Sequence, residues 1–159
     1  YFPRIIIPIA AAMTGIVDYC VALTIVFGLM AYYHISPSIN IFFLPLVVIL
    51  TLLLVIGLSF WIGAINVKYR DVRYIMPFFI SLMLYMTPVI YPVSVAPNFR
   101  NILHLNPMTG IIEAHRSLIL GNPPINYTSL LISIISSLVI LITGAIFFRS
   151  VERKFADVV

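Results

Sequence analysis

The chain has 159 residues, of which 62% are hydrophobic and 9% are charged, and its mean hydropathy is +1.14. Soluble domains carry about a quarter charged residues, so this composition excludes a soluble protein and predicts an all-α integral membrane protein. The formal net charge of +4 does not indicate a nucleic-acid partner, because the basic residues stand at the ends of apolar runs, where topology signals lie. The one cysteine, Cys20, lies within an apolar run, so no intrachain disulfide is possible.

The first apolar run covers about residues 5–33 and contains Pro8 and Asp18. A straight membrane crossing needs about 20 residues, so we expect an interfacial start followed by a spanning helix. The chain begins at Tyr1 without the basic region and the cleavage site of a signal peptide. We therefore expect it to be an internal or C-terminal piece of a longer membrane protein.

Three more apolar runs follow, at about residues 41–65, 74–90 and 130–148. Together the four runs predict four spanning helices. This count places the start of the chain, the charged break at residues 66–73 and the end of the chain on one side of the membrane. That side holds most of the nine basic residues, namely Arg4, Lys68, Arg70, Arg73, Arg149, Arg153 and Lys154. The positive-inside rule then puts both ends of this segment in the cytoplasm.

Residues 98–121 carry helix signals on the outer side of the membrane. Asn106 and Pro107 are typical of an N-cap and a first helical residue, and Gly121 suits the position after the last helical residue. The enclosed helix is too short to span a bilayer. It therefore either lies in the interface or dips into the membrane and returns as a re-entrant segment.

No residue pattern supports catalysis on this chain. It lacks the GxxxxGK[ST] loop that cradles phosphates and the GxSxG turn of serine hydrolases. The three histidines, His34, His104 and His115, do not stand at a metal-ligand spacing. Glu113 and Arg116 are three residues apart on the expected outer helix, which favours an intrahelical ion pair. We expect no enzyme activity, metal or cofactor on this chain.

Asp18 is the one acidic residue well inside an apolar run. It lies about 13 residues, or roughly 20 Å, from the expected start of the first helix. A charge at that depth is costly in lipid, so its side chain should face protein or water. One interpretation is a residue of a transport path or of energy coupling, and the other is a structural hydrogen bond to a neighbouring helix. The sequence leaves both open.

Tyr74, Phe78 and Tyr85 lie within about 40° of one another on the third expected helix. Such a stripe can line a path in which sugar rings stack on aromatic faces, or it can face lipid at the membrane boundary. The sequence does not decide between these interpretations.

Small residues mark the faces on which helices approach closely. Ser59 and Gly63 form one such pair on the second run. The fourth run carries Ser129, Ser133, Ser137 and Gly144 along one side. We expect these faces to pack, either within the bundle or in an oligomer.

The order of several short segments resembles the ABC-2 type permeases. The segments are "YFPRIIIPIA" before a helix, "VKYRDVRYIMPFF" between helices, "TPVIYPVS" at an outer end and "LNPMTGIIEAHRSLILG" before the last helix. Within that family the resemblance is closest to the branch that exports O-antigen, teichoic acid and related polysaccharides. The resemblance implies six spanning helices in the whole protein, of which this chain has the last four. It also implies a bacterial cytoplasmic membrane location.

The resemblance further implies the partners. Two permease copies pair around a central channel as a homodimer, and each binds a separate ATPase subunit, which carries ATP and Mg. Lipid-linked glycan enters from the cytoplasmic leaflet and leaves through the channel.

The resemblance also implies residue roles. By position, residues 66–73 match the cytoplasmic segment that contacts the ATPase, with Lys68, Tyr69, Arg70, Asp71 and Arg73 as its candidate contacts. Candidates for the translocation path are Phe78, Tyr85 and Tyr91. Residues 98–121, with Asn106, Pro107, Glu113 and Arg116, match the short re-entrant helices near the channel exit.

Three other functions stay open from the sequence. The chain could belong to an ABC-2 exporter of drugs or other hydrophobic small molecules. It could be a membrane scaffold that transports nothing, with its basic residues serving only as topological anchors. A membrane-embedded enzyme acting on lipid-linked sugars is disfavoured, because no paired carboxylates or histidines lie within the apolar runs.

Overall fold

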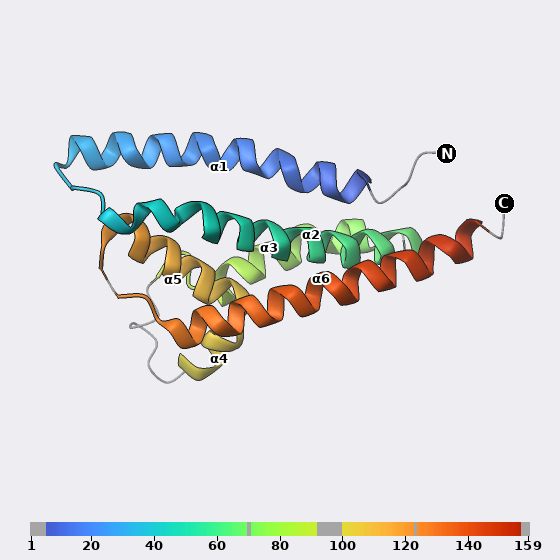
Figure 1. The fold of residues 1–159 in the computed structure, drawn as a ribbon. Helices are drawn as coiled ribbons and strands as arrows, with labels where there is room; N and C mark the ends of the chain where they lie inside the picture. The colour runs from blue at the N-terminus through green and yellow to red at the C-terminus, as the bar shows by residue number, and fades with distance from the viewer. Residues whose placement is uncertain (1–5, 70, 92–99, 123, 157–159) are drawn as a thin grey trace.

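The computed structural model describes residues 6–69, 71–91, 100–122 and 124–156. All regular structure in these ranges is helical, as the composition predicts. Seven helical elements follow one another along the chain: α1 (Ile6–Tyr32), the 3-10 helix η1 (Ile39–Phe43), α2 (Leu44–Lys68), α3 (Val72–Met86), α4 (Arg100–Leu105), α5 (Pro107–Leu120) and α6 (Tyr127–Ala156). Figure 1 shows α1, α2 and α6 as three long helices running side by side, with α4 and α5 gathered at one end.

Three stretches in the described ranges are long and apolar enough to cross a membrane: Pro8–Tyr32, Ile39–Lys68 and Tyr127–Arg153. The prediction of a fourth spanning helix at residues 74–90 is not met. α3 has 15 residues, or about 22 Å at 1.5 Å each, whereas the hydrocarbon core is about 30 Å thick. It stops at Met86 because Thr87 precedes Pro88 and takes the extended conformation (φ −104°, ψ 134°), which a following proline favours over the helical one.

Two helices extend beyond the ends of the predicted apolar runs, because charged residues continue them. α2 extends from the predicted Ile65 to Lys68, and α6 extends from Phe148 to Ala156. Arginine, lysine and glutamate are good helix formers, so a change from apolar to charged residues marks a membrane boundary rather than a helix end. The charged break predicted at residues 66–73 is therefore only a short junction between α2 and α3.

The central contact of the bundle is between α2 and α6, whose backbones touch. A Cβ atom added at Gly57 would lie 2.8 Å from the Cα atom of Leu141, and one at Gly144 would lie 2.6 Å from the carbonyl oxygen of Gly57. Neither space admits a side chain. The packing role predicted for Gly144 is confirmed. Gly63 also contacts a side chain of α6, since its added Cβ would lie 3.5 Å from the ring of Phe148.

The serine-lined side of α6 packs against α5. Ser129, Ser133 and Ser137 are fully buried, and a Cβ atom at Gly110 of α5 would overlap the Ser129 carbonyl group and the Ser133 hydroxyl group. The hydroxyl groups of Ser133 and Ser137 donate to the carbonyl groups four residues earlier, at 3.0 and 2.6 Å. The Ser129 hydroxyl group instead bonds the Nδ1 atom of His104 in α4. Because the hydroxyl groups of Ser133 and Ser137 are satisfied within α6, these two serines act as small residues that let α5 approach.

The start of α1, the end of α6 and the junction between α2 and α3 lie at one end of the bundle (Figure 1). α3 leads the chain back from that end (Figure 1). Five basic residues of the described ranges belong to it: Lys68 ends α2, Arg73 lies in the first turn of α3, and Arg149, Arg153 and Lys154 lie in the last turns of α6. Arg4 and Arg70 lie outside the described residues. The expected gathering of bases at one end therefore holds for these five.

The contact between α2 and α6 can be tested with two matched glycine substitutions. Gly57→Val should lower the apparent Tm of the detergent-solubilised protein by about 5 °C, because overpacking costs about 1–3 kcal/mol. Gly28→Val is the control, since nothing lies within 4 Å of a Cβ at Gly28 of α1. Both variants add the same β-branched residue to a helix, so equal shifts in Tm would contradict the backbone contact.

Candidate functional site

The junction between α2 and α3 exposes a cluster of charged and aromatic side chains. Lys68, Tyr69, Asp71 and Arg73 are all exposed, and Arg70 lies outside the described residues. The Lys68 ammonium group stands 5.1 Å from the centre of the Tyr69 ring, within the range of a cation–π contact. Asp71 occupies the N-cap position of α3, yet its side chain makes no capping hydrogen bond. Among the described residues, the Asp71 carboxylate thus forms no hydrogen bond or ion pair.

The junction is short and firmly joined to both helices. The Tyr69 N–H group donates to the Ile65 carbonyl of α2 at 2.8 Å, and the Tyr74 N–H group of α3 donates to the Asp71 carbonyl at 3.0 Å. The Val72 N–H group also donates to the Tyr69 carbonyl at 3.3 Å. The described residues on both sides of Arg70 are therefore hydrogen-bonded to a helix or to each other.

α3 is held against the rest of the described chain only loosely, and none of its residues is buried. The aromatic side chains of Tyr74, Phe78 and Tyr85 are 82%, 71% and 69% exposed. Tyr91, which follows α3, is half-buried, and its hydroxyl group donates to the Tyr85 carbonyl at 3.0 Å. These residues are available on the surface, and their place in a translocation path stays a prediction.

α5 begins and ends where the sequence indicates. The Asn106 side chain accepts from the Met108 N–H group at 3.0 Å, Pro107 is the first helical residue, and Gly121 takes the left-handed conformation (φ 77°) that stops the helix. The Asn106 amide group also donates to the Thr87 hydroxyl group at 3.1 Å. The cap of α5 therefore also contacts the end of α3.

Arg116 makes a second link between α5 and the end of α3. Its guanidinium group donates to the carbonyl groups of Val89 and Tyr91. The predicted ion pair between Glu113 and Arg116 is wrong, because Glu113 instead lies 4.0 Å from the Nδ1 atom of His104. The Val89 and Tyr91 carbonyl groups follow the end of α3, so no N–H group of the helix bonds them. A guanidinium group has five N–H donors and can therefore bind both carbonyl groups.

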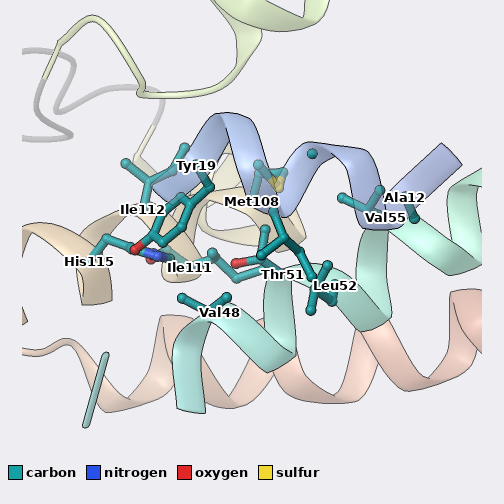
Figure 2. A pocket seen from close by; sticks show the side chains of 12 residues that line it. Ala12, Tyr19, Val48, Thr51, Leu52, Val55, Met108, Ile111, Ile112 and His115 are labelled. Atoms are coloured by element: carbon teal, nitrogen blue, oxygen red, sulfur yellow. The ribbon is translucent and has the colours of Figure 1, made fainter. Parts of the chain in front are cut away.

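A mainly apolar pocket of about 300 Å³ lies between α1, α2 and α5. Figure 2 shows Tyr19 of α1 and His115 of α5 beside each other within it. Their ring centres are 5.7 Å apart, and the Tyr19 hydroxyl group and the His115 Nε2 atom are buried without a hydrogen-bond partner. Burial lowers the pKa of His115 below its usual 6.5, against an opposing effect of its hydrogen bond to the Ile111 carbonyl. With no charged lining residue, the pocket suits an apolar group better than a glycan.

Asp18 is exposed on α1. It lies ten residues after Pro8, the first residue of the candidate span Pro8–Tyr32, or about 15 Å along the helix, close to the middle of a 30 Å hydrocarbon core. A carboxylate facing lipid at that depth costs about 3 kcal/mol. The predicted contact with a neighbouring helix is not made by any helix in the described ranges.

The charged junction, the exposed aromatic helix and the outer helix pair correspond to the three regions that the sequence singles out, in the order that the ABC-2 resemblance implies. The sequence pattern of the ABC-2 type transporter family matches residues 2–120. The chain belongs to this family. It is 26% identical over 159 residues to the O-antigen export system permease protein RfbA of Klebsiella pneumoniae, a match that covers 99% of this chain and 61% of the relative. It is also 26% identical to the protein of the same name from Myxococcus xanthus, with 98% and 61% covered.

These matches confirm the resemblance to the polysaccharide-export branch of the ABC-2 permeases. The chain spans 61% of the length of these relatives. The three candidate spans and the matches together identify the chain as part of a multi-pass membrane protein. Its relatives are bacterial transport permeases. Within the described residues, no group of three or more metal-ligating side chains gathers.

Sequence reasoning missed two features of this region. Arg116 was assigned an acidic partner by its spacing, whereas its carbonyl partners lie 25 and 27 residues earlier in the chain. The Tyr19–His115 contact joins two helices that are far apart in the sequence, and no local sequence pattern predicts it.

The link through Arg116 can be tested by Arg116→Gln. Loss of two hydrogen bonds from a charged donor should free the end of α3 and speed amide hydrogen exchange in a peptide covering residues 82–91 by about tenfold. Arg73→Gln, which removes an exposed arginine at the other end of α3, is the control and should leave this exchange unchanged. Equal exchange in wild type and Arg116→Gln would contradict the link.

Proposed function

We propose that this chain is part of the membrane permease of an ABC-2 exporter that moves a lipid-linked polysaccharide across the bacterial cytoplasmic membrane. We infer the substrate class from the match to O-antigen export permeases, which extends along 99% of the chain. In this proposal ATP hydrolysis takes place on a separate ATPase subunit, as membership of the ABC-2 family implies.

The proposal includes a topology. In this proposal the fourth crossing consists of α3 together with the turn that follows it, residues 87–91. Both ends of the segment then lie in the cytoplasm with the α2–α3 junction. The five described bases at that end of the bundle support this orientation.

The ATPase subunit binds at the α2–α3 junction in this proposal. Lys68, Tyr69, Asp71 and Arg73 face outward there, and Arg70 lies between them in the sequence. The unused carboxylate of Asp71 supports a partner, because a topological anchor needs basic residues only. ATPase closure would push on a junction that is hydrogen-bonded to both α2 and α3, and so would tilt both helices.

The glycan passes along the aromatic surface of α3. Phe78 and Tyr85 expose rings on which sugar rings can stack, and Tyr91 continues this surface outward. A second permease copy closes the channel on the other side as a homodimer. α4 and α5 form the re-entrant segment at the exit, and Arg116 ties that segment to the end of α3. Movement of α3 is then passed on to the exit.

A second candidate function is export of hydrophobic small molecules. The apolar pocket of about 300 Å³ favours it, because small-molecule sites begin near that volume. The pocket lies away from α3, between α1, α2 and α5, whereas the aromatic surface of α3 suits a long chain of sugar rings. Loss of surface glycan in a strain without the permease supports the first function, and unchanged glycan with lost drug efflux supports the second.

The coupling role is tested by reversing two charges at the junction. Arg70→Glu with Asp71→Lys should reduce co-purification of the ATPase and glycan export by at least about tenfold, because like charges would face the partner. The control, Arg149→Glu with Glu152→Lys, also exchanges one base and one acid at the same end of the bundle. Normal export in the junction variant, with both proteins correctly inserted, would contradict the coupling role.

The path is tested by Tyr85→Ala, which removes one exposed ring of α3. Export of glycan should fall by about tenfold, equivalent to about 1.4 kcal/mol of lost stacking in the passage step. Tyr127→Ala removes a similarly exposed ring at the start of α6 and should leave export unchanged. Full activity of Tyr85→Ala at normal protein level would assign Tyr85 to lipid contact.

A further inference from the structure

We propose that a further membrane helix of the same protein, from outside residues 1–159, covers the face of α1 around Asp18 and donates a hydrogen bond to its carboxyl group. We call this surface the Asp18 face; it comprises Ala11, Thr14, Asp18, Ala22 and Ile25, all of them exposed. The proposal concerns how the permease assembles, and it stands whatever substrate the permease carries.

The Asp18 face is a single continuous strip of the helix. Its members lie four or seven residues from Asp18, which places them within about 40° of its direction. The bundle uses the other side of α1, where Ala12 and Met30 are buried and Tyr19 and Leu23 pack against the core. In the described chain, the Asp18 face therefore has nothing packed on it.

Asp18 is the polar group on this face that still needs a partner. The Thr14 hydroxyl group already donates to the Ala11 carbonyl at 2.7 Å, within α1 itself. Asp18 makes no hydrogen bond or ion pair with any residue of the described ranges. Whether charged or protonated, a carboxyl group in the middle of a bilayer is unfavourable without a polar partner. Lipid therefore does not suit this face.

The residues beside Asp18 favour a helix as the covering element. Ala11, Thr14 and Ala22 are small, and small residues let two membrane helices approach closely enough for side-chain hydrogen bonds between them. The curated relatives also provide the necessary length, since this chain spans 61% of them.

A second copy of this chain fits the Asp18 face poorly. A two-fold contact of the face with itself would place two Asp18 side chains together. The basic residues of the described ranges suit the role poorly in a second copy. Lys68, Arg73, Arg100, Arg149, Arg153 and Lys154 lie near helix ends, and Arg116 is bound to two carbonyl groups. We therefore place the donor on another part of the protein.

The occupant can be identified by photo-crosslinking in the complete natural protein in membranes. Benzoylphenylalanine at Ala22 should give an internal crosslink, which mass spectrometry maps to a peptide outside residues 1–159. The same probe at Thr24, which points to another side of α1, is the control for position. A crosslinked dimer would assign the face to a second copy, and a lipid adduct alone would assign it to lipid; either result overturns the proposal.

The hydrogen bond can be tested by the direction of a stability change. Asp18→Leu should lower the apparent Tm of the complete protein by several degrees, because it leaves the donor unpaired, while Asp18→Asn should restore most of the loss. Thr24→Val, which removes a hydroxyl bonded within α1, should have little effect. A raised Tm in Asp18→Leu would show a lipid-facing carboxyl group, and an unchanged Tm would show no partner; both contradict the proposal.

Two further variants cover the remaining outcomes. If Asp18→Leu yields no folded protein, Ala22→Phe carries the test, since a large ring should lower the Tm only if a helix covers this face. In a cysteine-free background of the complete protein, Ala22→Cys should resist a water-soluble maleimide that labels Tyr32→Cys at the helix end. Rapid labelling of Ala22→Cys would show a water-filled path and would overturn the proposal.

Discussion

The backbone contact between α2 and α6 is the constraint on which the rest of the described structure depends. Gly57 and Gly144 let the two helices touch without intervening side chains, and in lipid such close packing replaces the hydrophobic effect that would hold a soluble bundle together. α5 then packs against α6 through Gly110 and the buried serines. The position of α5 in turn sets where Arg116 meets the end of α3.

α3 differs from the other long helices because it is held mainly at its ends. At one end the short junction joins it to α2, and at the other end Asn106 and Arg116 bind it to the outer helix pair. Between these ends none of its residues is buried. A helix fixed in this way can transmit a displacement from the junction to the outer segment while it presents its aromatic side chains to a passing substrate. This arrangement gives the proposed export cycle a physical basis.

Sequence reasoning succeeded where a signal is local. The all-helical architecture follows from hydropathy alone, and Asn106, Pro107 and Gly121 mark the two ends of α5 correctly because caps depend on neighbouring residues. It failed where a partner is distant. The spacing of Glu113 and Arg116 suggested a pair, but the guanidinium group instead binds the carbonyl groups of Val89 and Tyr91, which lie after the end of α3. Likewise, the length of the third apolar run did not reveal that Thr87 would end α3 early.

The proposed contact between the α2–α3 junction and an ATP-hydrolysing subunit can be tested by site-specific crosslinking at Tyr69. Tyr69 is exposed and next to the charged residues, so a Tyr69→Cys side chain in a Cys20→Ser background can carry a short crosslinker. With the complete transporter in membranes, we expect one dominant crosslinked product that contains the ATPase subunit and whose yield changes when ATP is bound. A junction that crosslinks only to lipid or to the permease itself, with the ATPase present and active, would contradict the account.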